Sequence, residues 1–184
     1  MNVMDILYIL LLLAGLALGF FNGTIKLAVT IIAFYVGIIL ASLYFQTVGN
    51  FYRTQFGSST DVAQITAFAT ILLVAFLLLT VAGLYTFRYA QLPTSLDFVD
   101  RIVGTLLGLG LAALIMGMLS ILLRDLFVFR NVAASIDLPF MIFLQNNIRS
   151  SFLVAFFGTE LLPLIYGILE PILPQEADII FRIQ

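Results

Sequence analysis

Residues 6–26 read ILYILLLLAGLALGFFNGTIK, and this stretch decides the fold class. The 20 residues between Asp5 and Lys26 carry no charge, and leucine and isoleucine dominate them. A helix of about 20 residues covers the ~30 Å of hydrocarbon at the centre of a bilayer. Lipid offers no hydrogen-bond partner to an exposed backbone, so a segment of this kind is expected to be helical. The stretch therefore predicts a transmembrane helix.

Charged residues mark off three further runs of spanning length. The uncharged runs hold 26 residues between Lys26 and Arg53, 26 between Asp61 and Arg88, and 22 between Arg101 and Arg124. We therefore expect an all-α polytopic membrane protein with four transmembrane helices, which span about residues 6–21, 25–45, 62–87 and 101–123. Together, residues 1–124 form the predicted four-helix transmembrane domain.

The remaining residues, 125–184, are expected to form a C-terminal segment associated with the membrane. Residues 151–169 are apolar, but Gly158, Glu160 and Pro163 lie near the middle of this stretch. A charge is costly in lipid, and proline disturbs the helical hydrogen-bond ladder. We therefore favour an interfacial or partly re-entrant helix over a fifth span.

Two of the predicted connections carry turn-forming residues. Asn22-Gly23 favours a tight turn between the first two helices, and the Thr24 hydroxyl is placed to cap the second one. The next connection combines the turn formers of residues 49–53 with those of residues 57–61. We expect it to be a solvent-facing loop.

Composition excludes several classes of protein. The chain is 62% hydrophobic and 10% charged, whereas soluble domains carry about 25% charged residues. Its net charge is −2 and it has no basic patch interleaved with aromatics, which argues against a nucleic-acid partner. Cysteine and histidine are both absent, which removes disulfides, thiolate zinc sites and histidine-dependent catalytic triads. We expect no catalytic residues, no cofactor and no metal site.

Small residues recur at four-residue spacing in two of the predicted helices. The stripes consist of Gly15, Gly19 and Gly23 in the first helix and of Gly104, Gly108 and Ala112 in the fourth. Such stripes let helix backbones approach closely, and van der Waals packing supplies much of the association between helices in lipid. We therefore expect the first and fourth helices to pack at close range. The alternative is that glycine is simply frequent in membrane helices.

Four charged residues lie where the predicted helices begin. Asp100 is placed to cap the fourth helix and to interact favourably with its positive N-terminal dipole, and Asp5 has the same place in the first helix. Arg101 is expected to anchor the fourth helix among lipid phosphates or to pair with Asp97. The stem of Lys26 can run along apolar surface and place its ammonium group among the headgroups.

A polar path through the membrane has three candidate residues. Thr66 and Thr70 share one face of the third predicted helix, and Glu160 is the carboxylate embedded in the apolar C-terminal stretch. Transporters usually place an ionisable residue well inside the membrane, and none of the four runs has one near its midpoint. A small oligomeric transporter or channel component is therefore the alternative hypothesis, and not the favoured one.

Two stretches form motifs. The first is Asp5 followed by GFFNGTIK at residues 19–26, and the second is DRIVG at residues 100–104 with Gly108 four residues on. Together they resemble the colicin V production protein (CvpA) family of small bacterial inner-membrane proteins with four predicted membrane helices. The chain departs from the family at Asn22 and at Gly110, near which members often carry basic residues.

The resemblance implies a non-enzymatic protein of the bacterial inner membrane, linked to colicin V production or export and to envelope maintenance. It favours a membrane-embedded scaffold or accessory subunit that acts through contacts of its helices with lipids and other proteins. The expected partners are membrane lipids and either other membrane subunits or further copies of the chain.

Overall fold

The computed structural model describes residues 2–90, 97–129, 139–161 and 167. Its helices are α1 (Val3–Phe56), α2 (Thr60–Thr86), α3 (Asp97–Arg124), α4 (Pro139–Arg149) and α5 (Phe152–Phe156), together with the π-helical turns η2 (Asp125–Phe129) and η4 (Phe157–Leu161). These described residues contain no strand, and α1, α2 and α3 are long and apolar enough to cross a membrane. The prediction of an all-α protein with long apolar helices is confirmed.

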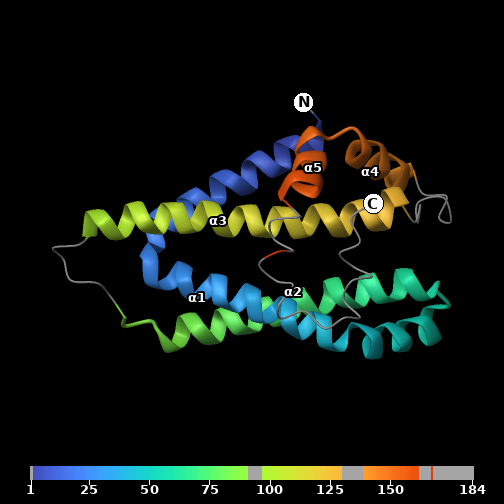
Figure 1. The fold of residues 1–184 in the computed structure, drawn as a ribbon, viewed down its shortest axis with the longest axis horizontal. Coiled ribbons are helices and arrows are strands. Elements are labelled where there is room, and N and C mark those ends of the chain that lie inside the picture. Colours follow the sequence, from blue (N-terminus) through green and yellow to red (C-terminus); the bar gives the residue numbers. More distant parts are fainter. Residues whose placement is uncertain (1, 91–96, 130–138, 162–166, 168–184) are drawn as a thin grey trace.

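Helix α1 is broken at Gly23 into two arms. Gly23 has φ 74° and ψ 177°, a backbone conformation that is essentially restricted to glycine. In Figure 1 the first arm, residues 3–22, runs toward one end of the molecule, and the second arm, residues 24–56, runs back from it. The tight turn expected at Asn22-Gly23 is thus a one-residue break, with helix on both sides.

The second arm is longer than the sequence predicts. The loop expected at residues 49–53 is helical, and only residues 57–59 separate α1 from α2. Gly49 packs closely against α2, because a Cβ on it would lie 3.0 Å from the Cα of Gln64. Its missing side chain therefore serves a helix contact and not a turn. The arm ends at Gly57, which has φ 65° and donates its N–H to the Arg53 carbonyl at 3.0 Å.

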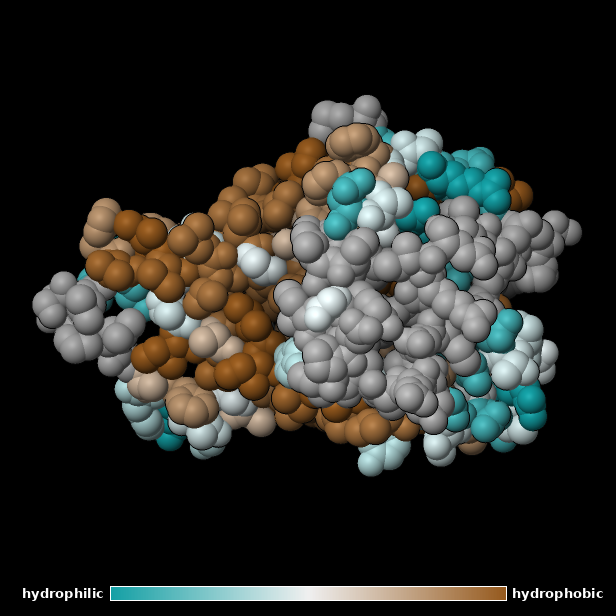
Figure 2. All heavy atoms as spheres, viewed as in Figure 1, coloured by the Kyte–Doolittle hydropathy of each residue, from teal (hydrophilic) through white to brown (hydrophobic). Residues whose placement is uncertain are grey.

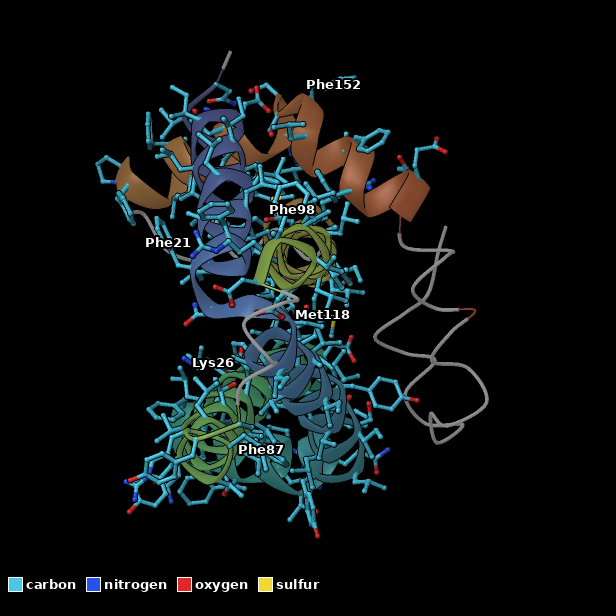
Figure 3. The ribbon with its side chains drawn as sticks, turned by 90° about the vertical axis from the view of Figure 1, so that its left-hand side faces the viewer. Phe21, Lys26, Phe87, Phe98, Met118 and Phe152 are labelled. Carbon is cyan, nitrogen blue, oxygen red and sulfur yellow. The ribbon has the colours of Figure 1, made fainter. Side chains whose placement is uncertain are left out.

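Helix α3 lies between the two arms of α1, and Figure 3 shows it nearly end-on in that position. In the most apolar 18-residue stretch of α3, half of the residues are buried inside the protein, compared with 22% in the corresponding stretches of α1 and α2. The main core joins the second arm, α2 and α3 through Leu27, Phe34, Ile38, Ala41, Phe45, Phe68, Leu72, Leu111, Met118 and Ile121. The first arm covers the opposite side of α3.

The C-terminal helices pack against the first arm and the end of α3. A second apolar cluster joins Tyr8 of the first arm to Met116 of α3, Val154 of α5 and Phe157 of η4. Within it the hydroxyls of Tyr8 and Ser120 share a hydrogen bond of 2.8 Å. Beyond Leu161 the predicted interfacial or re-entrant helix is described only at Gly167. Its remainder, which includes Pro163, lies outside the described residues.

Apolar side chains cover much of the outer surface. Figure 2 shows them over the arms of α1 and the start of α3, whereas hydrophilic residues gather over α4 and where α1 meets α2. Outward-facing residues that are more than half exposed include Ile32, Leu43, Leu73, Leu77, Leu78 and Val81. An apolar surface of this extent indicates contact with lipid or with other membrane helices.

We call the end of the molecule near Gly23 the break end and the opposite end the loop end.

Candidate functional site: the glycine interface and the polar cleft at the break in α1

The first arm and α3 meet through glycine backbones. A Cβ on Gly15 would lie 2.5 Å from the Cβ of Ala112 and 2.7 Å from the carbonyl oxygen of Gly108. A Cβ on Gly19 would overlap the Gly104 carbonyl, and one on Gly108 would overlap the Gly15 carbonyl. The structure therefore brings the two stripes of small residues together, backbone against backbone.

Four-residue spacing explains this contact. Residues four apart lie one above the other on a helix, so two such stripes form two facing grooves without side chains. In lipid the hydrophobic effect does not drive helices together, and close van der Waals contact replaces it. The interface, which we call the glycine interface, holds the first arm on α3 and sets the distance between them.

At the break end, α3 supplies a hydrogen-bond acceptor for the second arm. The first amides of a helix have no partner within it. The Oδ1 of Asp100 accepts a hydrogen bond of 2.7 Å from the Thr24 amide, and the Thr24 hydroxyl donates to the Asp100 carbonyl at 3.1 Å. A Cβ on Gly23 would overlap the Oδ2 of Asp100, so this contact also requires glycine there.

The roles of Asp100 and Thr24 differ from those expected. Helix α3 begins at Asp97, which places Asp100 one turn inside it, and its carboxylate caps the second arm of α1 instead of its own helix. The Thr24 hydroxyl bonds across to α3 instead of capping the helix that it starts. Both residues therefore join α1 to α3.

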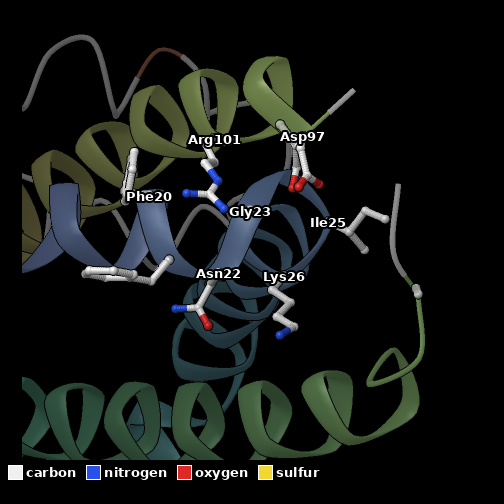
Figure 4. A pocket seen from close by; sticks show the side chains of 10 residues that line it. Phe20, Asn22, Gly23, Ile25, Lys26, Asp97 and Arg101 are labelled. Carbon is white, nitrogen blue, oxygen red and sulfur yellow. The ribbon is translucent and has the colours of Figure 1, made fainter. Parts of the chain in front are cut away.

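A polar cleft of about 370 Å³ lies beside this junction, as Figure 4 shows. Its lining consists of Phe20, Phe21, Asn22, Gly23, Ile25, Lys26, Ala90, Asp97, Asp100 and Arg101. The Arg101 guanidinium lies over the Phe20 ring, 5.4 Å from its centroid. Within the part of the chain that the structure describes, neither Lys26 nor Arg101 forms an ion pair, and the expected Arg101–Asp97 pair is not formed. The cleft thus offers two cations to a ligand.

Asp5 lies far from this cleft, near the C-terminal helices. It is 8% exposed, and its Oδ1 accepts hydrogen bonds from the Ser151 hydroxyl at 2.7 Å and the Leu153 amide at 3.1 Å. Its Oδ2 accepts from the Asn2 amide at 3.0 Å, which completes a capping box at the start of α1. Asp5 therefore ties the first residues of the chain to α5.

Asn2 and Ser151 are partners of Asp5 that its place at the start of the helix does not predict. One signal was available, because an Asn followed three residues later by an acidic residue, just before an apolar run, is typical of a helix start. A serine directly before the apolar residues 152–157 is a second cap signal, and the Ser151 hydroxyl accepts from the Val154 amide at 3.2 Å. Neither signal identifies the partner across the fold.

The candidate polar path does not present free hydroxyl groups. The hydroxyls of Thr66 and Thr70 donate to the carbonyls of Val62 and Thr66 in their own helix, at 2.7 and 2.8 Å. Glu160 is exposed on η4, which packs against α3 and α5. Across the described ranges, no group of three acidic residues lies close enough to hold a metal ion.

Comparison with known families gives one match. Residues 4–161 match the profile of a family described as colicin V production protein. Neither the curated proteins nor the solved structures give a match. The matched range includes both helices of the glycine interface and the polar cleft.

Substitution of Gly19 by alanine tests the glycine interface. The new Cβ would meet backbone atoms of Gly104 and Thr105, which move only if the helices separate. We expect Gly19→Ala to lower the free energy of unfolding by about 1–3 kcal/mol, as overpacking does in other cores. Thermal unfolding of the purified protein in mild detergent measures this change.

Gly110→Ala is the matched control on α3, because no atom lies within 4 Å of a Cβ at that position. Its higher helix propensity should leave the stability equal or raise it by up to about 1 kcal/mol. Equal losses in the two variants would contradict the interface.

Asp100→Ala tests the junction at the break. It leaves the Thr24 amide without its acceptor, so we expect a loss of about 0.5–2 kcal/mol, the range for lost helix caps. Asp97→Ala removes the same charge from an exposed position in the same turn and should change the stability by less. Chemical unfolding of both variants in the same detergent compares them, and an equal effect of Asp97→Ala would show that charge, not capping, matters.

Proposed function

We propose that this chain, which belongs to the colicin V production protein family, acts as a scaffold or accessory subunit in the bacterial inner membrane without chemistry of its own. Its membership of the family supports the proposal that it serves colicin V production or export together with envelope maintenance. Its apolar helices indicate a multi-pass membrane protein.

One observation carries the scaffold role: several polar groups along the helices are used to join helices. The Asp100 carboxylate holds the second arm, the Asp5 carboxylate holds α5, and the buried Tyr8 and Ser120 hydroxyls bond to each other. Such contacts fix the arrangement of the helices, whereas an enzyme would need polar groups that face a substrate. The outer faces of α1 and α2 are apolar and remain available to lipids and partner helices.

We further propose that the chain crosses the membrane four times. The break at Gly23 divides α1 into arms of about 30 and 50 Å at 1.5 Å per residue, and either is long enough for the ~30 Å hydrocarbon core. The excess length of the second arm lies at its loop end, where Tyr52 is of a residue type enriched at membrane interfaces.

Cysteine labelling tests this topology, because the chain has no cysteine of its own. With four spans, Val3→Cys and Ser58→Cys should react with a membrane-impermeant maleimide from the same side of oriented vesicles. Ala90→Cys, near the break end, should react from the opposite side. If Val3→Cys and Ser58→Cys react from opposite sides, α1 crosses the membrane once and the four-span proposal is wrong.

Export of colicin V separates the scaffold from the transporter hypothesis. In cells that lack their own family member, a triple variant with Thr66→Ala, Thr70→Ala and Glu160→Gln should restore export as well as the wild-type chain does. The transporter hypothesis requires that the same variant abolish export. A Gly19→Ala/Gly108→Ala double variant serves as the loss-of-function control, since it disrupts the helix arrangement that a scaffold needs.

The scaffold role also requires an assembly. Native mass spectrometry after extraction in mild detergent should recover the chain in a larger complex of fixed stoichiometry. A lone homo-oligomer, combined with loss of export in the triple variant, would favour the transporter.

A further inference from the structure

We propose that the break end binds one phospholipid, with its phosphate held by Lys26 and Arg101 in the polar cleft and an acyl chain in an adjoining groove on α3. This inference requires that the chain lies in a membrane, but it does not depend on the scaffold role. It rests on two neighbouring hollows of opposite character that share a wall.

The groove is apolar. It has a volume of about 380 Å³, and its lining consists of Phe20, Phe98, Arg101, Ile102, Thr105 and Leu106. Phe98 and Leu106 are 76% and 64% exposed, so they contact whatever lies beside α3 in the bilayer. The Thr105 hydroxyl donates to the Arg101 carbonyl at 2.7 Å, which leaves no hydroxyl donor pointing into the groove. An alkyl chain suits such a surface.

The groove and the cleft are continuous. Phe20 and Arg101 line both, and the guanidinium lies over the Phe20 ring at the point where they meet. A ligand that fills both hollows needs an apolar tail joined directly to a charged head. Phospholipids have this form, and the proposed four-span topology places the start of α3 at the membrane edge, where their headgroups are found.

The two cations of the cleft are the groups that would bind a phosphate, beside the carboxylates of Asp97 and Asp100. Arg101 and Lys26 form no ion pair within the described ranges. The Asp100 carboxylate is already bonded to the Thr24 amide, which leaves Asp97 as the other carboxylate of the lining. In Figure 4 the Arg101 and Lys26 side chains lie on opposite sides of the α1 backbone around Gly23, so the flexible Lys26 side chain must turn toward Arg101 to share a ligand with it. A phosphate between them would receive charge-assisted hydrogen bonds from both.

The binding of phosphatidylglycerol to the delipidated full-length protein tests the site. Titration in detergent, followed by native mass spectrometry, should show one lipid molecule that binds each chain with higher affinity than any further lipid molecules do. Each cation near an anionic headgroup contributes about fivefold, so Lys26→Gln/Arg101→Gln should weaken this binding by about 25-fold. Leu106→Trp, at a groove position that is 64% exposed and outside the glycine interface, should fill the groove and weaken binding without lowering the melting temperature measured in the absence of lipid.

Arg88→Gln is the matched control. Arg88 lies at the same end, stacked on Tyr85 and Tyr89 at 4.6 and 4.5 Å, and does not line the cleft. This variant should change the affinity by less than about twofold, because its charge acts only through the general potential. If Arg88→Gln weakened binding as much as the Lys26→Gln/Arg101→Gln double variant does, the proposal would be overturned, since the lipid would then respond to net charge alone.

Two competitors separate the lipid from simpler ligands. Glycerol 3-phosphate has the phosphate without the chains, and diacylglycerol has the chains without the phosphate. Neither compound should displace phosphatidylglycerol when it is added at the same concentration as the lipid. Displacement by glycerol 3-phosphate would replace the lipid site by a free-phosphate site, and displacement by diacylglycerol would show an apolar groove only; either result overturns the proposal.

Discussion

A backbone amide that loses its helical partner near lipid needs another acceptor, and this constraint governs the centre of the structure. The break at Gly23 frees the Thr24 amide, and the Asp100 carboxylate accepts its hydrogen bond from α3. Asp100 reaches Thr24 only because α3 lies against the first arm at the distance that the glycine interface sets. The break, the cap and the two stripes of small residues therefore act as one unit.

This unit explains why α3 is the central helix. One arm of α1 contacts it through backbone atoms at Gly15 and Gly19, and the other contacts it through large side chains such as Phe34 and Phe45. The two contacts differ because the arms lie at different distances from α3. Small residues allow the close contact, and bulky ones fill the wider space between α3, the second arm and α2.

The sequence predicts the long apolar helices well, because an apolar run of 20 residues without a charge is typical of a membrane-spanning helix. It also predicts which faces carry small residues, since four-residue spacing is a local property. It fails at Gly49, where the same residue type that forms turns serves a close helix contact instead. It fails again at Asp100, whose acceptor role depends on a partner 76 residues away. For Asp5 it predicts the cap at the start of α1 but not the partner 146 residues away. Spacing along one helix holds no information about such partners.

The hydrogen bonds of Asp5 to Ser151 and Leu153 have a consequence for the order of biosynthesis. Protein chains are made from the N-terminus, so the first turn of α1 is synthesised before α5. The Asp5 carboxylate nevertheless cannot form its hydrogen bonds to Ser151 and Leu153 until residue 153 has left the ribosome. A segment made early is thus fixed in place only after the residues of α5 have been synthesised.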